Sequence, residues 1–300
     1  MILCAGEALI DMLPRKAATG EDAFAPHAGG AVFNTAIALG RLGAPAGFLC
    51  PLSDDLFGDR LAAVLAESGV DASACPRVDR PSTLAFVTLT DGHAKYAFYD
   101  TGTALSAATP AELRVPRGAT ALFLGGISLA GTAADAFAAL AETDLPLMLD
   151  PNVRPAFARD AAAYKARLLA LIGRADIVKV SDEDLDWLTG DGGEDGARAL
   201  LGQGPRLVCL TRGAKGVVAL TARGRVEQPA HEATVIDTVG AGDTFNAGLL
   251  AGLHEAGALT KDALGDVPEA ALRAALDLGA RAAAVTVSRA GANPPRRDEI

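Results

Sequence analysis

The segment from Asp237 to Gly248, which reads DTVGAGDTFNAG, places a carboxylate directly after a turn of small residues. Residues 240–242 lead into Asp243, and the alanine-, glycine- and leucine-rich run that follows has the composition of a buried helix. The N–H groups at such a helix start can point at one anion, and the helix dipole favours phosphate there. Asp243 is therefore either a proton acceptor beside a bound phosphate or an ordinary helix cap, a position that aspartate favours.

Three further polar segments follow short apolar runs that read as strands. They are DPNVR from Asp150 to Arg154, SDED from Ser181 to Asp184, and TRGAKG from Thr211 to Gly216. Each has a plain interpretation as a turn or as a charged first helical turn. Ligands of open parallel sheets bind beyond the carboxyl ends of the strands, however, and an acidic cluster that suits a hard cation, an arginine and a glycine-rich turn all fall at such ends. Because the sequence has neither a Walker-type GxxxxGK[ST] motif nor a GxGxxG motif that opens a helix, a nucleotide would bind by the rules of another fold.

The elements around these segments alternate between strands and helices. After Pro116, continuous apolar runs predict strands at 121–124, 145–149, 177–180 and 207–210. Between them, helical runs are predicted at 133–141, 161–172 and 182–188, and a further helix within 28–43. Continuous apolar strands that alternate with helices predict a parallel sheet covered on both faces.

One region interrupts this alternation. Between Pro81 and Asp100, apolar and polar residues alternate on both sides of Asp91-Gly92, which is a strong hairpin signal. The hairpin is predicted to be a flap or part of a small added sheet, and the alternative is an edge hairpin of the main sheet. The stretch 15–27 reads as polar and irregular.

Composition limits the class of protein. Half of the 300 residues are apolar, which allows one large core, and a formal net charge of −10 argues against a nucleic-acid partner. The four cysteines lie far apart and read as buried thiols in a reducing cytosol. No basic region precedes the first apolar residues, and the longest uncharged stretch, 118–134, is too short for a membrane span. We therefore expect a cytoplasmic protein without a membrane partner.

Two segments together resemble the signature regions of the ribokinase-like (PfkB-type) carbohydrate kinases. These are GGAVFNTAIALGRLG, from Gly29 to Gly43, and DTVGAGDTFNAG. Glu7, Asp11, the hairpin, DPNVRP and TRGAKG occur in the expected order, so the resemblance covers nearly the whole chain. It implies one ribokinase-like α/β domain over 1–300, with a central, mostly parallel sheet, helices on both faces, and a small β-sheet lid from segments near 11–27 and 81–100. The implied activity is transfer of the γ-phosphoryl group of ATP to a sugar hydroxyl, with ATP and Mg²⁺ as cofactors.

The resemblance also implies roles for single residues. Asp243 would be the general base, and the anion hole would be formed by backbone of the turn Gly240, Ala241 and Gly242. The residues around the sugar would be Asp11, Gly30 and Asn34 at its hydroxyls and Phe98 closing over its ring. The residues around the phosphates and the nucleotide would be Asn152, Arg154, Thr211, Gly213, Gly216 and, at the adenine, Asn293.

The metal positions depart from the family pattern. Where relatives often have Asn-x-x-Glu, this chain has Ser181 and Asp184, so either Asp184 or Glu183 would organise Mg²⁺ through water. Asp237 and Val239 resemble the main-chain sites of a monovalent cation, such as K⁺, that some members use.

Local sequence narrows the choice of the sugar substrate. The GGAxxN form, Arg41-Leu-Gly43 and DPNVRP are most similar to fructokinases. The main rival is a 2-keto-3-deoxygluconate kinase, whose acid substrate would need a cation such as Arg154 or Lys95, and ribokinase and adenosine kinase are further options. A non-catalytic sugar-binding regulator is the alternative from another class, but it would have no need of the base in GAGD. An exposed lid sheet would also allow a homodimer through the lids.

Overall fold

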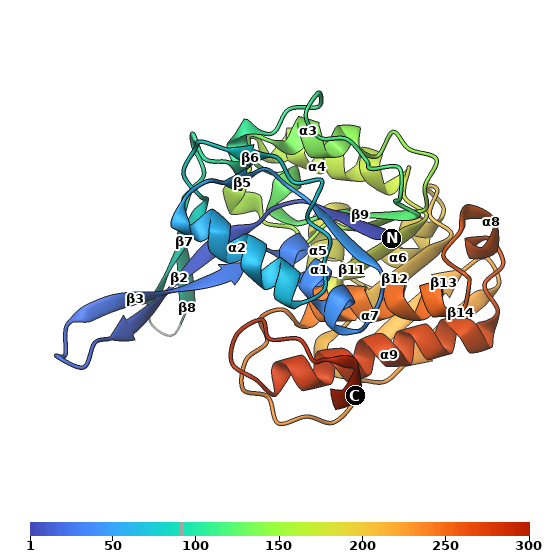
Figure 1. Cartoon of the computed structure of the whole chain (residues 1–300). Coiled ribbons are helices and arrows are strands. Elements are labelled where there is room, and N and C mark those ends of the chain that lie inside the picture. Colours follow the sequence, from blue (N-terminus) through green and yellow to red (C-terminus); the bar gives the residue numbers. More distant parts are fainter. Residues whose placement is uncertain (91–92) are drawn as a thin grey trace.

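The computed structural model describes residues 1–90 and 93–300, and its centre is an eight-stranded sheet (Figure 1). The strand order is β14-β13-β12-β11-β10-β9-β1-β4. The strands are β1 (Ile2–Ala5), β4 (Ala46–Leu49), β9 (Ala121–Gly125), β10 (Leu147–Asp150), β11 (Ile177–Ser181), β12 (Leu207–Thr211), β13 (Val217–Thr221) and β14 (Gly224–Gln228). Neighbours from β4 to β12 pair in parallel, and β13 and β14 are antiparallel. The predicted parallel sheet is confirmed, with each predicted strand within two residues of its observed bounds.

Helices lie on both sides of this sheet, as Figure 1 shows for α3 and α4 on one side and α7 and α9 on the other. The helices are α1 (Ala31–Arg41), α2 (Leu56–Glu67), α3 (Ala134–Ala139), α4 (Ala161–Ile172), α5 (Asp182–Thr189), α6 (Glu194–Leu201), α7 (Ala241–Glu255), α8 (Lys261–Leu264) and α9 (Glu269–Val287). Strands β1, β4, β9 and β10 are buried along their whole length, because helices cover both faces. This is why their sequences are continuous apolar runs rather than alternating ones.

Helices α7 and α9 pack backbone against backbone. A Cβ atom on Gly248 would lie 2.5 Å from the Cα of Gly279, and one on Gly252 would lie 2.5 Å from the Cα of Ala275. The small residues after Asp243 therefore allow a close approach that fixes α7, and with it the turn before Asp243, against the rest of the fold.

A second, four-stranded sheet projects from the main body with the order β3-β2-β7-β8 (Figure 1). It consists of β2 (Leu9–Lys16), β3 (Asp22–Gly29), β7 (Leu84–Thr90) and β8 (His93–Tyr99). β7 and β8 pair in antiparallel fashion, which confirms the predicted hairpin, and β7 pairs with β2, so the hairpin belongs to the small sheet and not to the main one. The predicted turn residues Asp91 and Gly92 lie outside the described residues. The irregular reading of 15–27 is wrong, because β3 is a regular strand whose alternating exposed and half-buried residues are mostly small or polar.

The remaining elements are short. They are β5 (Leu52–Ser53), β6 (Arg77–Val78) and the 3₁₀ turns η1 (Leu105–Ala107), η2 (Gly126–Leu129), η3 (Pro155–Phe157), η4 (Gly213–Lys215) and η5 (Arg297–Glu299). Across residues 1–90 and 93–300, no helix combines the length and the apolar character needed to cross a membrane.

Candidate active site

The start of α7 is built around a glycine and not around a capping carboxylate. Gly240 occupies the position before the helix with φ of 79°, a left-handed conformation that glycine adopts without strain, and no described side chain caps this end. A Cβ atom on Gly240 would lie 2.7 Å from the Cβ of Ala292, so a larger residue would also displace the neighbouring loop. The capping interpretation of Asp243 is therefore wrong.

Asp243 lies in the first turn of α7 and is only 7% exposed. Its carboxylate accepts a hydrogen bond of 2.9 Å from the side-chain amide of Asn34 on α1, which comes from the other end of the chain. Burial raises the pKa of Asp243 to about 7; Asp150 raises it as well, while the bond from Asn34 and the charge of Lys179 lower it. A carboxylate with a pKa near the working pH is well suited to accept a proton during a reaction.

Asp11 and Gly30 lie where the lid sheet meets the main body. Asp11 is on β2, and a Cβ atom on Gly29 of β3 would collide with its carboxylate. Gly30 precedes α1 with φ of 111°, so it turns the chain from the lid into the helix that carries Asn34. Burial raises the pKa of Asp11 to about 6. The structure thus brings a lid carboxylate close to the start of the helix whose Asn34 holds Asp243.

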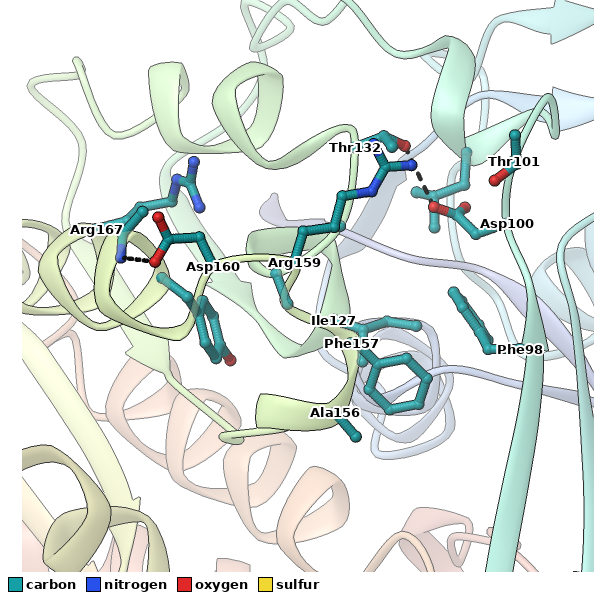
Figure 2. A pocket seen from close by; sticks show the side chains of 15 residues that line it. Phe98, Asp100, Thr101, Ile127, Thr132, Ala156, Phe157, Arg159, Asp160 and Arg167 are labelled. Carbon is teal, nitrogen blue, oxygen red and sulfur yellow. Dashed lines mark hydrogen bonds between the residues drawn. The ribbon is translucent and has the colours of Figure 1, made fainter.

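Phe98 of β8 contacts the main body through an aromatic pair. Its ring meets that of Phe157 on η3 edge to face, with centroids 4.8 Å apart and an interplanar angle of 76°. Both rings line a cavity of about 550 Å³, together with Ile127 of η2 and Tyr164 of α4 (Figure 2). Phe98 is therefore placed to cover a ligand in this cavity, although Asp11, Asn34 and Asp243 are not among the residues that line it.

Of the two cations considered for an acid substrate, the structure describes the side chain of Arg154 only. Arg154 is exposed, and its guanidinium donates to the backbone carbonyl oxygen of Val153 at 2.9 Å. The side chain of Lys95 lies outside the described part of the structure.

A second cavity, also of about 550 Å³, adjoins the start of α7. Thr211, Gly213 and Gly216, from the segment between β12 and β13, line it together with Ala241 and Gly242. Its remaining wall is largely apolar and includes Phe245, Ala280, Ala283, Ala284 and Val287. A flat apolar group with phosphates attached would fit there, with the phosphates toward the helix start.

Asn293 does not line this cavity. Its amide oxygen accepts a hydrogen bond of 2.9 Å from Arg41 at the end of α1, and its side chain is exposed. The expected contribution of Asn293 to an adenine wall therefore has no counterpart in this cavity, because Arg41 holds the side chain elsewhere. Asn152 follows β10 with φ of 40°, a left-handed conformation that costs energy for a residue with a side chain.

The two candidate metal carboxylates differ in environment. Asp184 is buried, and its Oδ1 accepts a hydrogen bond of 3.1 Å from the backbone N–H of Val153, beside the DPNVR segment. Glu183 is exposed. Among the residues described, no group of three or more histidine, cysteine, aspartate or glutamate side chains forms a metal site. This donor set suits Mg²⁺ that is held mainly by phosphates and waters, and Asp184 is the buried one of the two candidate carboxylates.

Asp237 joins the loop before α7 to the segment that follows α9. One carboxylate oxygen accepts from the backbone N–H of Val239 at 3.0 Å, and the other accepts from that of Gly291 at 2.9 Å. The two residues expected at a monovalent cation therefore lie in one turn, beside the segment that packs against Gly240.

Sequence reasoning assigned no role to two buried charged groups, Glu7 and Lys179. Glu7 accepts hydrogen bonds from the backbone N–H groups of Ala31 (2.8 Å) and Ser128 (3.1 Å), so it joins the starts of α1 and η2. Lys179 lies on β11 and donates to Asp150 at 3.0 Å. The available signal was a charged residue inside or next to an apolar run, since such a residue is rarely buried without a partner.

Comparison with known proteins identifies the class. The chain belongs to the pfkB family of carbohydrate kinases, whose family model matches residues 1–299. It is 48% identical over 279 residues, 91% of this chain and 86% of the relative, to a fructokinase of Rhizobium leguminosarum bv. trifolii. The resemblance that the motifs indicated is confirmed, and so are the ribokinase-like fold and the sugar-kinase class.

Solved structures of fructokinases have a similar fold. A fructokinase of Xylella fastidiosa with bound ATP superposes with a TM-score of 0.88 and 30% identity, covering 97% of this chain and 93% of that one. A fructokinase of Vibrio cholerae O395, in a form with fructose, ADP and calcium ion bound, has a TM-score of 0.81 and 26% identity. The superposition covers 97% of this chain and 94% of that one.

Proposed function

We propose that this carbohydrate kinase is a fructokinase, which transfers the γ-phosphoryl group of ATP to a hydroxyl of fructose. The observation that carries the proposal is Asp243, a buried carboxylate with a pKa of about 7 at a helix start that also lines a cavity of nucleotide size. The choice of fructose is supported by the 48% identity to a fructokinase.

In this proposal each part of the site has one task. Asp243 accepts the proton of the sugar hydroxyl that attacks, and Asn34 orients the carboxylate through the 2.9 Å bond. The backbone N–H groups of Ala241 and Gly242 stabilise the charge on the transferred group, and Thr211, Gly213 and Gly216 border the nucleotide. Asp11, Gly30 and Phe98 bind the sugar. ATP would bring Mg²⁺, organised through water by Asp184 rather than by the exposed Glu183, and Mg²⁺ would neutralise phosphate charge.

A coupled assay of ADP release tests this function. The acceptors are fructose, 2-keto-3-deoxygluconate, ribose and nucleosides, and we expect fructose to have the highest kcat/KM. A higher value for any other acceptor would reassign the sugar. In the same assay, chelation of Mg²⁺ should abolish activity, and replacement of K⁺ by Na⁺ should lower it if Asp237 and Val239 border a K⁺ site.

Phe98→Ala should weaken sugar binding more than it slows transfer. Loss of an aromatic contact of this kind costs about 0.5–1.5 kcal/mol, so we expect KM for the sugar to rise about 3- to 10-fold. Because ring contact acts similarly on the bound sugar and on the transition state, kcat should stay within about twofold. Steady-state kinetics at saturating ATP measure both constants. A fall in kcat at unchanged KM would contradict a role of Phe98 in sugar binding.

The outer face of the lid supports a proposal of a homodimer. Tyr99, which points to the opposite face from its neighbour Phe98, is 60% exposed, and Phe24 is 41% exposed. Both pack edge to face on Phe86, with centroids 5.6 and 5.0 Å away. Two lids that meet at this aromatic patch would cover it. Sedimentation equilibrium of the chain and of Tyr99→Asp would show the dimer and its loss, and a monomeric parent chain would refute the proposal.

A further inference from the structure

Lys179 is a buried cation in a strand that is otherwise apolar. It lies on β11, within IVKVS, and is 5% exposed. Its Nζ donates to Oδ2 of Asp150, at the end of the neighbouring strand β10, at 3.0 Å, and Asp150 is 2% exposed. Removing two such charges from water is costly, so a buried pair of this kind does not by itself indicate a gain in stability.

The pair is connected to the helix that carries the candidate base. Oδ2 of Asp150 also accepts a hydrogen bond of 2.7 Å from the side-chain amide of Asn246, which lies on α7 one turn after Gly242 and is fully buried. Asn246 Oδ1 is buried and has no hydrogen-bond partner among the residues described. The Asn246 amide therefore depends on Asp150 for its one observed contact.

Lys179 also reaches the anion hole directly. A Cβ atom on Gly242 would lie 3.0 Å from Lys179 Nζ, so the ammonium group sits against the backbone of Gly242 on the side where a side chain would otherwise be. Gly242 itself lines the cavity that fits a nucleotide. The lysine thus lies behind the point at which phosphate charge would be bound and close to Asp243.

We propose that Lys179 is a positioning residue for phosphoryl transfer, which holds the N-terminal half of α7 through Asp150 and Asn246 and places a positive charge behind Gly242. This proposal rests on the kinase function proposed above. A charge fixed in a buried site acts strongly, because little water screens it and no reorganisation is needed as the reaction proceeds. The same charge favours the ionised form of Asp243, the form that can accept a proton.

The charges around Lys179 are consistent with this role. Burial lowers the pKa of Lys179, but the nearby carboxylates of Asp150, Asp184 and Asp243 together raise it above its ordinary value, so the ammonium stays charged. For Asp243, burial, Asp150 and Glu7 raise the pKa, while Asn34 and Lys179 lower it. Lys179 is thus a cation whose charge acts on both Asp184 and Asp243.

The experiment compares Lys179→Met with Lys165→Met in the full chain. Methionine keeps the unbranched shape and removes the charge. Lys165 on α4 is the matched control: its Nζ donates to the carbonyl oxygen of Trp187 at 3.0 Å, and it lines neither cavity. We expect Lys179→Met to lower kcat at least about 10-fold with KM values for sugar and ATP within about threefold, and to move the acid limb of kcat/KM to higher pH. Lys165→Met should leave kcat and the pH profile unchanged.

A double variant separates this role from simple charge balance. In Lys179→Met with Asp150→Asn, the carboxylate that Lys179 pairs with is removed together with the lysine, and the asparagine oxygen can still accept from Asn246. We expect the melting temperature to recover while kcat stays at least about 10-fold low. Recovery of wild-type kcat in the double variant, or a folded Lys179→Met with wild-type kcat and pH profile, would overturn the proposal. The acceptor in these assays is the sugar with the highest kcat/KM for the wild-type chain. A wrong assignment of the sugar is therefore seen already with the wild type, whereas a wrong role of Lys179 is seen only in the variants.

Discussion

Asp243→Asn should lower kcat by at least about 100-fold, since a general base contributes roughly 10²- to 10⁴-fold. The asparagine keeps the shape of the side chain and an oxygen that can accept from Asn34, but it cannot take the proton of the sugar hydroxyl. Affinity for sugar and ATP should change little, because other residues bind them. Steady-state kinetics and titration calorimetry measure these effects. A variant that retains more than about a tenth of the wild-type kcat would remove Asp243 from the mechanism.

The stability of the same variant provides a second measurement. The pKa of Asp243 is about 7 in the folded chain, against an ordinary value of 3.8. Its contribution to stability is therefore present below pH 3.8 and lost as the pH rises through about 7. At pH 8 the ionised carboxylate disfavours the folded state, so Asp243→Asn should melt no lower than the wild type.

Asp55→Asn is the matched control. Asp55 does cap a helix, because it accepts from the N–H groups of Phe57 (2.9 Å) and Gly58 (2.8 Å) at the start of α2. Burial raises its pKa, but hydrogen bonds from Gly58 and Ser82 outweigh this and lower it overall, so its contribution to stability is present at neutral pH. Asp55→Asn should therefore lower the melting temperature at pH 8 and leave kcat unchanged, the reverse of Asp243→Asn.

Activity should fall steeply on acidification. With a pKa of about 7, Asp243 becomes protonated as the pH falls, and kcat/KM should drop about tenfold for each unit below that value. Asp11, with a pKa of about 6, is expected to bind the sugar as a carboxylate, so a second limb should begin there and the slope should approach about 100-fold per unit.

Profiles of kcat/KM between about pH 5 and 9, on enzyme shown to remain folded, test this prediction. Asp11→Asn should remove the lower limb alone, and Asp243→Asn should remove the limb near 7. A wild-type profile that stays flat down to about pH 5.5 would contradict both assignments.

Local sequence determined the class and the position of the candidate site. Continuous apolar strands alternating with helices indicate a parallel sheet wherever they occur, since only such strands are covered on both faces. Glycine before Asp243 likewise indicates a helix start that can bind an anion, because the needed backbone conformation depends on the residue itself. Periodicity did not detect strand β3, because its half-exposed, small and polar residues carry no apolar period, and only the family resemblance placed this segment in a lid sheet.

Tertiary structure decided what the individual polar groups do. Asp243 read equally well as a cap or a base until Asn34, 209 residues away in the chain, proved to hold its carboxylate and Gly240 to occupy the cap position. Lys179 and Asp150 are 29 residues apart, and their pairing follows from two neighbouring strands that end beneath α7. Propensity and periodicity depend on neighbours in the chain, whereas burial, pKa and hydrogen-bond partners depend on neighbours in space, and for these residues the two sets do not coincide.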